Sequence, residues 1–172
     1  LNLPSAKKFV EPHFTMLWNE QIPDVELVDG EGRKTRLAVV AGVLHEQIAP
    51  SPPPGSWASE PTSDVSIWTL RMDPNATVTL PPANAGTSRS LYFYEGADVR
   101  VGDRSVAVGH RLDVTPDRPF IFQNGAAPAE ALGFQGASSY FDLEGDGDLD
   151  GATGKDLWVN DGTNQFTLVT EE

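Results

Sequence analysis

The chain has 172 residues, enough for one domain of ordinary size with a small appendage. Its 25 acidic and 12 basic residues give a formal net charge of -13, so we expect neither nucleic acid nor a membrane surface as a direct partner. The absence of cysteine excludes disulfides, thiolate catalysis and cysteine-based zinc sites.

The first part of the sequence predicts little regular structure before residue 36. We expect residues 1–30 to be an arm that lies on the following domain, with one short helical turn near residues 17–21. A buried strand is predicted at 36–44. The loop at 49–62 contains three consecutive prolines, which cannot donate ladder hydrogen bonds.

The middle of the sequence predicts an all-β domain, because short apolar runs alternate with turn residues. Short antiparallel strands at this spacing are typical of a double-sheet jelly roll. The expected strands are residues 65–72, 77–80, 89–94, 98–101, 105–108, 111–114, 120–123 and 129–134.

The character of the sequence changes after Gly136, from apolar alternation to an acidic, glycine-rich run. We therefore divide the chain into an arm at 1–30, a main domain at 31–136 and a tail at 137–172. The sequence begins at Leu1 with neither an initiator methionine nor a signal peptide, so we expect it to begin inside a longer protein. We also expect a cytoplasmic location.

The segment 80–96 resembles the metal-binding hairpin of a cupin barrel. A cupin carries two His on one strand, a Glu shortly afterwards and a Gly at the turn. With Gly96 as the turn, the His positions fall on Ala83 and Ala85, and the Glu position falls on Arg89. Alanine has no donor atom, and a guanidinium cation would repel a metal ion.

A second cupin motif would place another His near Ile121 or its neighbour, and the sequence has none there. The resemblance implies a cupin-type double-stranded β-helix with an N-terminal arm and a short C-terminal β appendage. It also leads us to expect neither iron nor a catalytic residue in this chain.

The order of segments from residue 1 to about residue 135 resembles the C-terminal half of a pirin, a family with two cupin barrels. The likeness rests on several linked blocks: LNLP at 1–4, EP at 11–12, PPP at 52–54, WA at 57–58, DVSIWTL at 64–70, LPP at 80–82 and LYFYEG at 91–96.

This resemblance implies a metal-free second barrel that serves as a structural module and has the N-terminal cupin barrel of the same protein as its partner. The alternative is that the chain belongs to an iron-dependent, quercetin-type dioxygenase whose metal site lies in that N-terminal barrel. The tail departs from the family, because a pirin ends with a Gly-Pro-Phe segment that this sequence lacks.

The tail contains an acidic loop with the spacing of a calcium site. Calcium takes six to eight oxygen ligands, and carboxylates two residues apart, a backbone carbonyl and water can supply them. Glycines within the loop let the backbone curl around an ion. The candidate ligands are Asp142, Glu144, Asp146, Asp148 and Asp150.

This loop and the following segment resemble a single FG-GAP or VCBS repeat, which implies a strand, a turn and a strand over residues 157–167. A calcium-dependent binding module is therefore a third hypothesis, and it would favour an extracellular or periplasmic location. An EF-hand is disfavoured, because Thr153 stands where its last carboxylate would be. A solvated acidic loop without calcium remains the alternative.

Overall fold

The computed structural model describes residues 9–137, 140–141, 150–153, 156–160 and 166–169. The chain divides into two compact units, Leu1–Ala137 and Ser138–Glu172. Within the described parts, no helix is long and apolar enough to cross a membrane. The first unit carries the features that bear on function.

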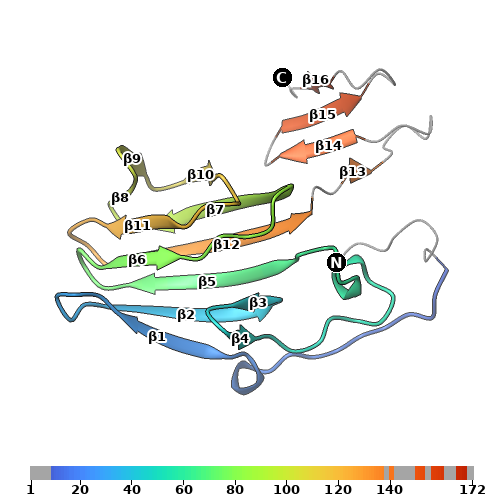
Figure 1. The fold of residues 1–172 in the computed structure, drawn as a ribbon, viewed down its shortest axis with the longest axis horizontal. Coiled ribbons are helices and arrows are strands. Elements are labelled where there is room, and N and C mark those ends of the chain that lie inside the picture. Colours follow the sequence, from blue (N-terminus) through green and yellow to red (C-terminus); the bar gives the residue numbers. More distant parts are fainter. Residues whose placement is uncertain (1–8, 138–139, 142–149, 154–155, 161–165, 170–172) are drawn as a thin grey trace. The chain divides into compact units, whose positions relative to one another are not determined.

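Two antiparallel sheets form the first unit (Figure 1). The larger has the order β1 (Asp24–Val28), β2 (Lys34–Ala41), β5 (Ser66–Met72), β12 (Ala129–Ala137), β7 (Thr87–Glu95) and β10 (His110–Asp113). The smaller has the order β6 (Thr77–Leu80), β11 (Phe120–Asn124), β8 (Asp98–Val101) and β9 (Arg104–Ala107).

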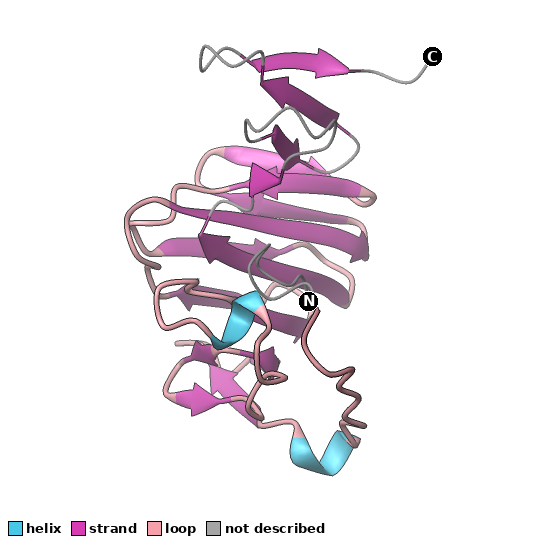
Figure 2. Ribbon diagram, turned by 90° about the vertical axis from the view of Figure 1, so that its right-hand side faces the viewer, coloured by secondary structure: helices cyan, strands magenta, loops and turns pink. Residues whose placement is uncertain are grey.

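The remaining elements of this unit are short. Strands β3 (Val43–Leu44) and β4 (Gln47–Ile48) form a small hairpin, and the 3-10 helices η2 (Asn19–Gln21) and η3 (Trp57–Ser59) lie in loops. Figure 2 shows strands and loops making up almost all of the described chain. These sheets confirm the prediction of an all-β jelly roll.

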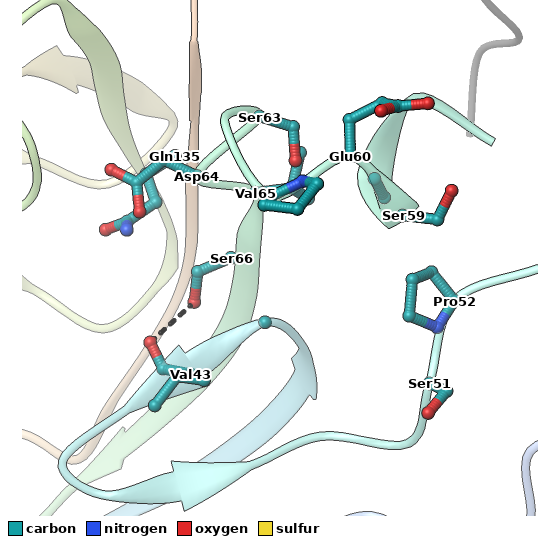
Figure 3. Close-up of a pocket in the computed structure, with 13 residues that line it drawn as sticks. Val43, Ser51, Pro52, Ser59, Glu60, Ser63, Asp64, Val65, Ser66 and Gln135 are labelled. Carbon is teal, nitrogen blue, oxygen red and sulfur yellow. Dashed lines mark hydrogen bonds between the residues drawn. The ribbon is translucent and has the colours of Figure 1, made fainter.

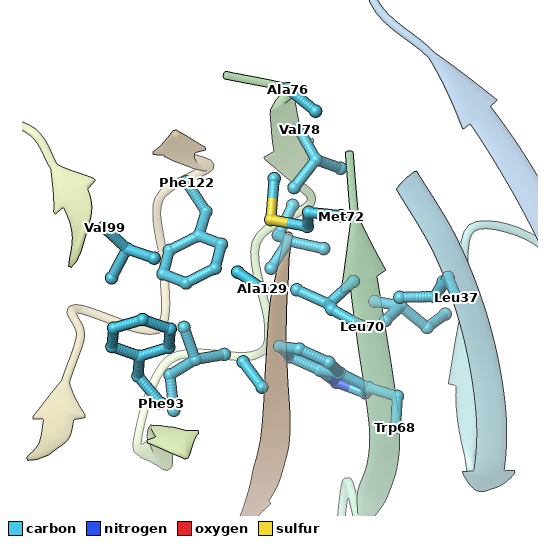
Figure 4. Packing of buried hydrophobic residues seen from close by; sticks show 14 of the residues in the cluster. Leu37, Trp68, Leu70, Met72, Ala76, Val78, Phe93, Val99, Phe122 and Ala129 are labelled. Atoms are coloured by element: carbon cyan, nitrogen blue, oxygen red, sulfur yellow. The ribbon is translucent and has the colours of Figure 1, made fainter. Parts of the chain in front are cut away.

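The core lies between the two sheets and is built from alternating residues of each strand. In β5, Trp68, Leu70 and Met72 are 0%, 0% and 3% exposed, and the residues between them are only half-buried or exposed. Phe93 and Phe122 face this set from other strands (Figure 4). Burial of one face of each strand is therefore the main stabilising term.

The register of β5, β12 and β7 arranges the core in rows across the large sheet. Leu70, Ala131 and Phe93 form one row, and Trp68, Gly133 and Leu91 form the next. A Cβ at Gly133 would lie 2.1 Å from the indole ring of Trp68. Glycine is required at this point because the large ring occupies the space of a side chain.

All eight strands expected between residues 65 and 134 are present, with ends shifted by at most a few residues. The strand expected at 36–44 is interrupted. Gly42 separates β2 from β3 with a φ of +73°, and a Cβ there would lie 2.0 Å from the carbonyl oxygen of Val65. This close approach of two backbones ends the strand early.

The arm differs from expectation in two respects. Its last part forms β1, which pairs with β2 at the edge of the large sheet and half-buries Val25 and Leu27. The side chains of Phe9, Phe14 and Trp18 are 101%, 82% and 62% exposed, so this stretch does not lie on the sheets as expected. The expected helical turn is η2, a single 3-10 turn.

The second unit has a four-stranded antiparallel sheet of β13 (Tyr140–Phe141), β14 (Asp150–Thr153), β15 (Asp156–Asn160) and β16 (Phe166–Val169). Strands β15 and β16 pair where the sequence predicted a strand, a turn and a strand. Asp150 begins β14, whereas Asp142, Glu144, Asp146 and Asp148 lie outside the described residues.

Candidate functional site

The three lost ligand positions of the cupin hairpin lie in or just after the connection from β6 to β7. Ala83 is half-buried and Ala85 is exposed, both in the loop before β7. Arg89 lies inside β7 and is only 2% exposed. The Glu position of the hairpin therefore carries a buried cation.

The fourth ligand position expected from the sequence is Ile121 or its neighbour, and the side chains of these two residues lie in different surroundings. Ile121 is 55% exposed, because β11 turns this residue away from the core. The ring of its neighbour Phe120 lies 4.9 Å from the guanidinium carbon of Arg89. Phe120 thus occupies the interior position, and the set that meets inside the barrel contains an aromatic ring and a guanidinium.

Arg89 is held mainly by aromatic rings and one carbonyl. Its guanidinium carbon lies 5.9 Å from the Trp68 ring as well as close to Phe120, within the range of a cation–π interaction. Nη1 donates a hydrogen bond to the carbonyl oxygen of Pro81. Nε and Nη2 are buried and have no acceptor among the described residues.

Burial lowers the pKa of Arg89 from its ordinary value to about 10, because desolvation penalises the charged form. The carboxylate of Asp64 acts in the opposite direction and favours the charge. The side chain is therefore protonated at neutral pH. A buried cation in which two nitrogens lack acceptors lowers the stability of the fold.

Arg89 belongs to a row of buried polar residues across three neighbouring strands. Gln135 of β12 pairs with Ser66 of β5 on one side and with Arg89 of β7 on the other. Their exposed fractions are 6%, 1% and 2%. We call Ser66, Gln135 and Arg89 the polar layer. It lies one row beyond Trp68, Gly133 and Leu91, at the end of the sheet where β5 and β7 begin.

A pocket of about 480 Å³ opens next to the polar layer (Figure 3). We call it the mouth pocket. Two members of the polar layer, Ser66 and Gln135, line it, and the rest of its wall comes from the start of β3 and from the segment between β4 and β5, which includes η3. Its lining residues are Gly42, Val43, Ser51, Pro52, Ala58, Ser59, Glu60, Pro61, Ser63, Asp64, Val65, Ser66 and Gln135.

Asp64 connects the mouth pocket to the cupin hairpin. Its Oδ2 accepts hydrogen bonds from the backbone N–H of Asn84 at 3.0 Å and from Oγ1 of Thr87 at 2.8 Å. Its backbone has a φ of +46°, a conformation that non-glycine residues rarely adopt. These bonds hold the loop that carries Ala83 and Ala85 against the segment before β5.

The residues at the cupin ligand positions do not fit iron. Two alanines, a phenylalanine ring and a guanidinium offer no lone pair to a metal ion. Within residues 9–137 and the described parts of the tail, no three His, Asp or Glu side chains are grouped closely enough to hold a metal. The chemistry available at this end of the barrel is hydrogen bonding by amide, hydroxyl and carboxylate groups.

Sequence reasoning missed Phe120, Gln135 and the role of Asp64. Alternation along β11 could have identified Phe120, because Phe120 and Phe122 share a face and Ile121 takes the other. Gln135 had no such signal, since its place beside Arg89 depends on the register of β12 with β7.

Comparisons with known proteins bear on the fold. No protein-family model matches the sequence, and no curated protein matches it either. The structure of quercetin 2,3-dioxygenase from Acinetobacter baumannii is similar, with a TM-score of 0.63 and 20% identity over 79% of this chain. A predicted oxalate decarboxylase from Thermotoga maritima has a TM-score of 0.45 and 12% identity, covering 72% of this chain and 99% of that one.

The chain spans 43% of the length of the Acinetobacter enzyme. At this identity the likeness concerns the fold. The order of the strands, the two facing sheets and this similarity together establish that residues 9–137 have the cupin jelly-roll fold.

Proposed function

We propose that this chain is the metal-free second barrel of a pirin-like protein with two cupin barrels, and that it acts as a structural and interdomain module without its own catalytic site. The observation that carries this proposal is Arg89. It stands at the Glu position of the cupin hairpin, 2% exposed and packed against Trp68 and Phe120.

Arg89 supports the proposal because its charge and size both oppose a metal ion. A divalent cation beside a guanidinium would be repelled in a medium that screens charge poorly. The ring of Phe120 and the methyl groups of Ala83 and Ala85 provide no ligand in compensation. Loss of a single histidine could leave a weakened site, whereas here every ligand position carries a group that cannot bind iron.

The proposed partner is the N-terminal cupin barrel of the same protein. The arm supports an interdomain role, because four large apolar side chains within ten residues are at least half exposed. Phe9, Phe14, Met16 and Trp18 are 101%, 82%, 53% and 62% exposed. Apolar groups gathered in this way on a surface are typical of an interaction site.

The rival proposal is that the chain is part of an iron-dependent, quercetin-type dioxygenase whose metal lies in the other barrel. The similarity in fold to the Acinetobacter quercetin 2,3-dioxygenase, which is more than twice as long as the matched region, supports it. The two proposals agree on this chain and differ on the intact protein.

Metal analysis combined with a quercetin turnover assay tests what the two proposals share, a barrel without iron in this chain. The 172-residue chain should hold no stoichiometric iron after incubation with Fe(II) and should not turn over quercetin. Iron near one equivalent per chain, lost on chelation together with turnover, would overturn the metal-free proposal.

A separate proposal concerns the tail, where the sequence motif supports a calcium site formed by Asp142, Glu144, Asp146, Asp148 and Asp150. Calcium that binds the folded state should raise the melting temperature of the full chain. The paired substitution Asp142→Ala with Asp146→Ala should abolish the increase, and Asp117→Ala, in an exposed loop of the other unit, should leave it intact. An equal increase in all three proteins, or none in the wild type, rejects the site.

A further inference from the structure

The polar layer contains hydrogen-bonding groups that the fold itself does not use. Gln135 is 6% exposed, and its side-chain amide makes no hydrogen bond within the part of the chain that the structure describes. Ser66 makes one long bond, from Oγ to the carbonyl oxygen of Val43 at 3.4 Å. Both residues line the mouth pocket.

Asn124, at the other end of the same core, shows what a structural amide looks like in this protein. It is 3% exposed, and its Nδ2 donates to the carbonyl oxygens of Asp73 at 2.8 Å and Ala127 at 2.7 Å. These bonds join two loops. Gln135 is nearly as buried and makes no such link, although Oδ1 of Asn124 also has no partner among the described residues.

The other side chains of the mouth pocket extend this pattern. Ser63 is 4% exposed, and its hydroxyl reaches the pocket. Asp64 uses Oδ2 for the hairpin loop, which leaves Oδ1 as an acceptor. The wall therefore offers an amide, several hydroxyls and a carboxylate, which together can both donate and accept hydrogen bonds.

The charges favour a neutral ligand. An anion would meet the carboxylates of Glu60 and Asp64, and none of the described residues that line the pocket is basic. A cation would gain little, because the charge of Asp64 already interacts with Arg89 behind the wall. Val43, Val65 and the two prolines supply aliphatic surface for the C–H faces of a ligand. The volume of about 480 Å³ lies within the usual range of ligand pockets.

We propose that the mouth pocket binds a neutral polyhydroxylated ligand of the size of a mono- or disaccharide, with Gln135, Ser63 and Asp64 as its hydrogen-bonding partners. A hydroxyl group can accept from the Gln135 amide or a serine and donate to a carboxylate, so such a ligand satisfies the groups that the fold leaves unused. This goes beyond the structural role proposed above and is independent of the metal question.

Ligand-observed NMR on the full chain tests the proposal with four probes. D-glucose and sucrose are the neutral ligands. D-glucuronate is the anionic analogue of glucose, and D-glucosamine is the cationic one. Gln135→Leu removes the amide at similar size. Gln123→Leu, the same change at an exposed residue of β11, is the matched control.

At least one neutral sugar should bind, more strongly than either charged analogue. Gln135→Leu should weaken that binding about tenfold, the effect of one lost hydrogen bond. Gln123→Leu should leave it unchanged. Thermal melting shows whether each variant folds. If Gln135→Leu does not fold, Ser63→Ala takes its place in the comparison. The proposal is overturned if neither neutral sugar binds, if a charged analogue binds more strongly, or if the pocket variants bind as the wild type does.

Discussion

The two ends of the core of this barrel are built from the same strands and differ in chemistry. Toward the end where β5 finishes, the inward residues of β5, β7 and β12 are Met72, Phe93 and Ala129, at most 3% exposed and apolar, with the buried Thr35 of β2 beside Met72. Toward the end where β5 begins, they are Ser66, Arg89 and Gln135, equally buried and all polar. The polar residues lie at one level of the three strands, because the register pairs Gln135 with both Ser66 and Arg89.

The difference separates a part of the core that stabilises the fold from a part that borders the mouth pocket. The apolar end supplies the hydrophobic burial that stabilises the sheets. Polar side chains near it, such as Asn124 and Asp29, bond to backbone groups of loops. At the polar end, Nε and Nη2 of Arg89 are buried without an acceptor among the described residues, and a buried group without a partner lowers stability. The following predictions compare these ends in order of expected effect.

The largest effect is expected in the apolar core. Phe122→Ala should lower the free energy of unfolding by about 3 to 5 kcal/mol, because Phe122 is fully buried and its removal leaves a cavity. Ile121→Ala, one residue earlier on the same strand and 55% exposed, should cost about 0.5 kcal/mol or less. Urea denaturation measures both. Similar losses for the two variants would contradict the assignment of the faces of β11.

Gly133→Ala tests the row that separates the two ends. The added methyl group would overlap the ring of Trp68, so we expect a loss of about 1 to 3 kcal/mol in unfolding free energy. Gly30→Ala is the control, since no atom lies within 4 Å of a Cβ there. Stability unchanged by Gly133→Ala would show that Trp68 does not occupy the described position.

Arg89→Met should raise the free energy of unfolding by about 1 kcal/mol, since it replaces a buried charge by an apolar side chain of similar length. Methionine keeps the contacts with Trp68 and Phe120 but loses the bond to Pro81. Arg71→Met, at an exposed arginine paired with Glu130, should change stability little. A marked loss for Arg89→Met would mean that the guanidinium stabilises the mouth.

The lowered pKa of Asp29, near the apolar end of the core, predicts that stability depends on pH. Burial alone would raise the pKa of Asp29, but hydrogen bonds from Arg33, Glu31 and Thr77 outweigh it and lower the pKa from 3.8 to about 2. Because the folded state holds this proton less tightly than the unfolded state, the stabilisation is complete above pH 3.8 and is lost as the pH falls toward 2.

Asp29→Asn should therefore remove part of the loss of stability between pH 4 and pH 2, about the range set by the two pKa values. Asp117→Asn, in an exposed loop, should not change it. Thermal melts across this range measure the effect, and equal acid sensitivity of the wild type and Asp29→Asn would contradict it.

Most strands could be predicted because their apolar residues alternate strictly between turn residues, as in β5 and β6. Strand β1 could not be identified with the same ease, since its five residues include two charged ones and only Val25 and Leu27 are half-buried. The break at Gly42 depends on the approach of Val65 from a distant segment, which no local pattern encodes.

The candidate site was predictable only in part. Spacing from Gly96 located Arg89, and its chemistry indicated that a metal would not bind there. The burial of Arg89 between Trp68 and Phe120, and its row with Ser66 and Gln135, depend on contacts between strands far apart in the sequence.

The central claim is that the expected ligand positions of this barrel, Arg89 included, carry no group that binds iron, and iron stoichiometry tests this most directly. The chain is incubated anaerobically with Fe(II), freed of unbound metal and analysed for iron per protein molecule, alongside Arg89→Met. We predict far less than one equivalent of iron in both proteins, because the alanines and Phe120 supply no ligands even without the guanidinium. One tightly bound iron per wild-type chain would contradict the account.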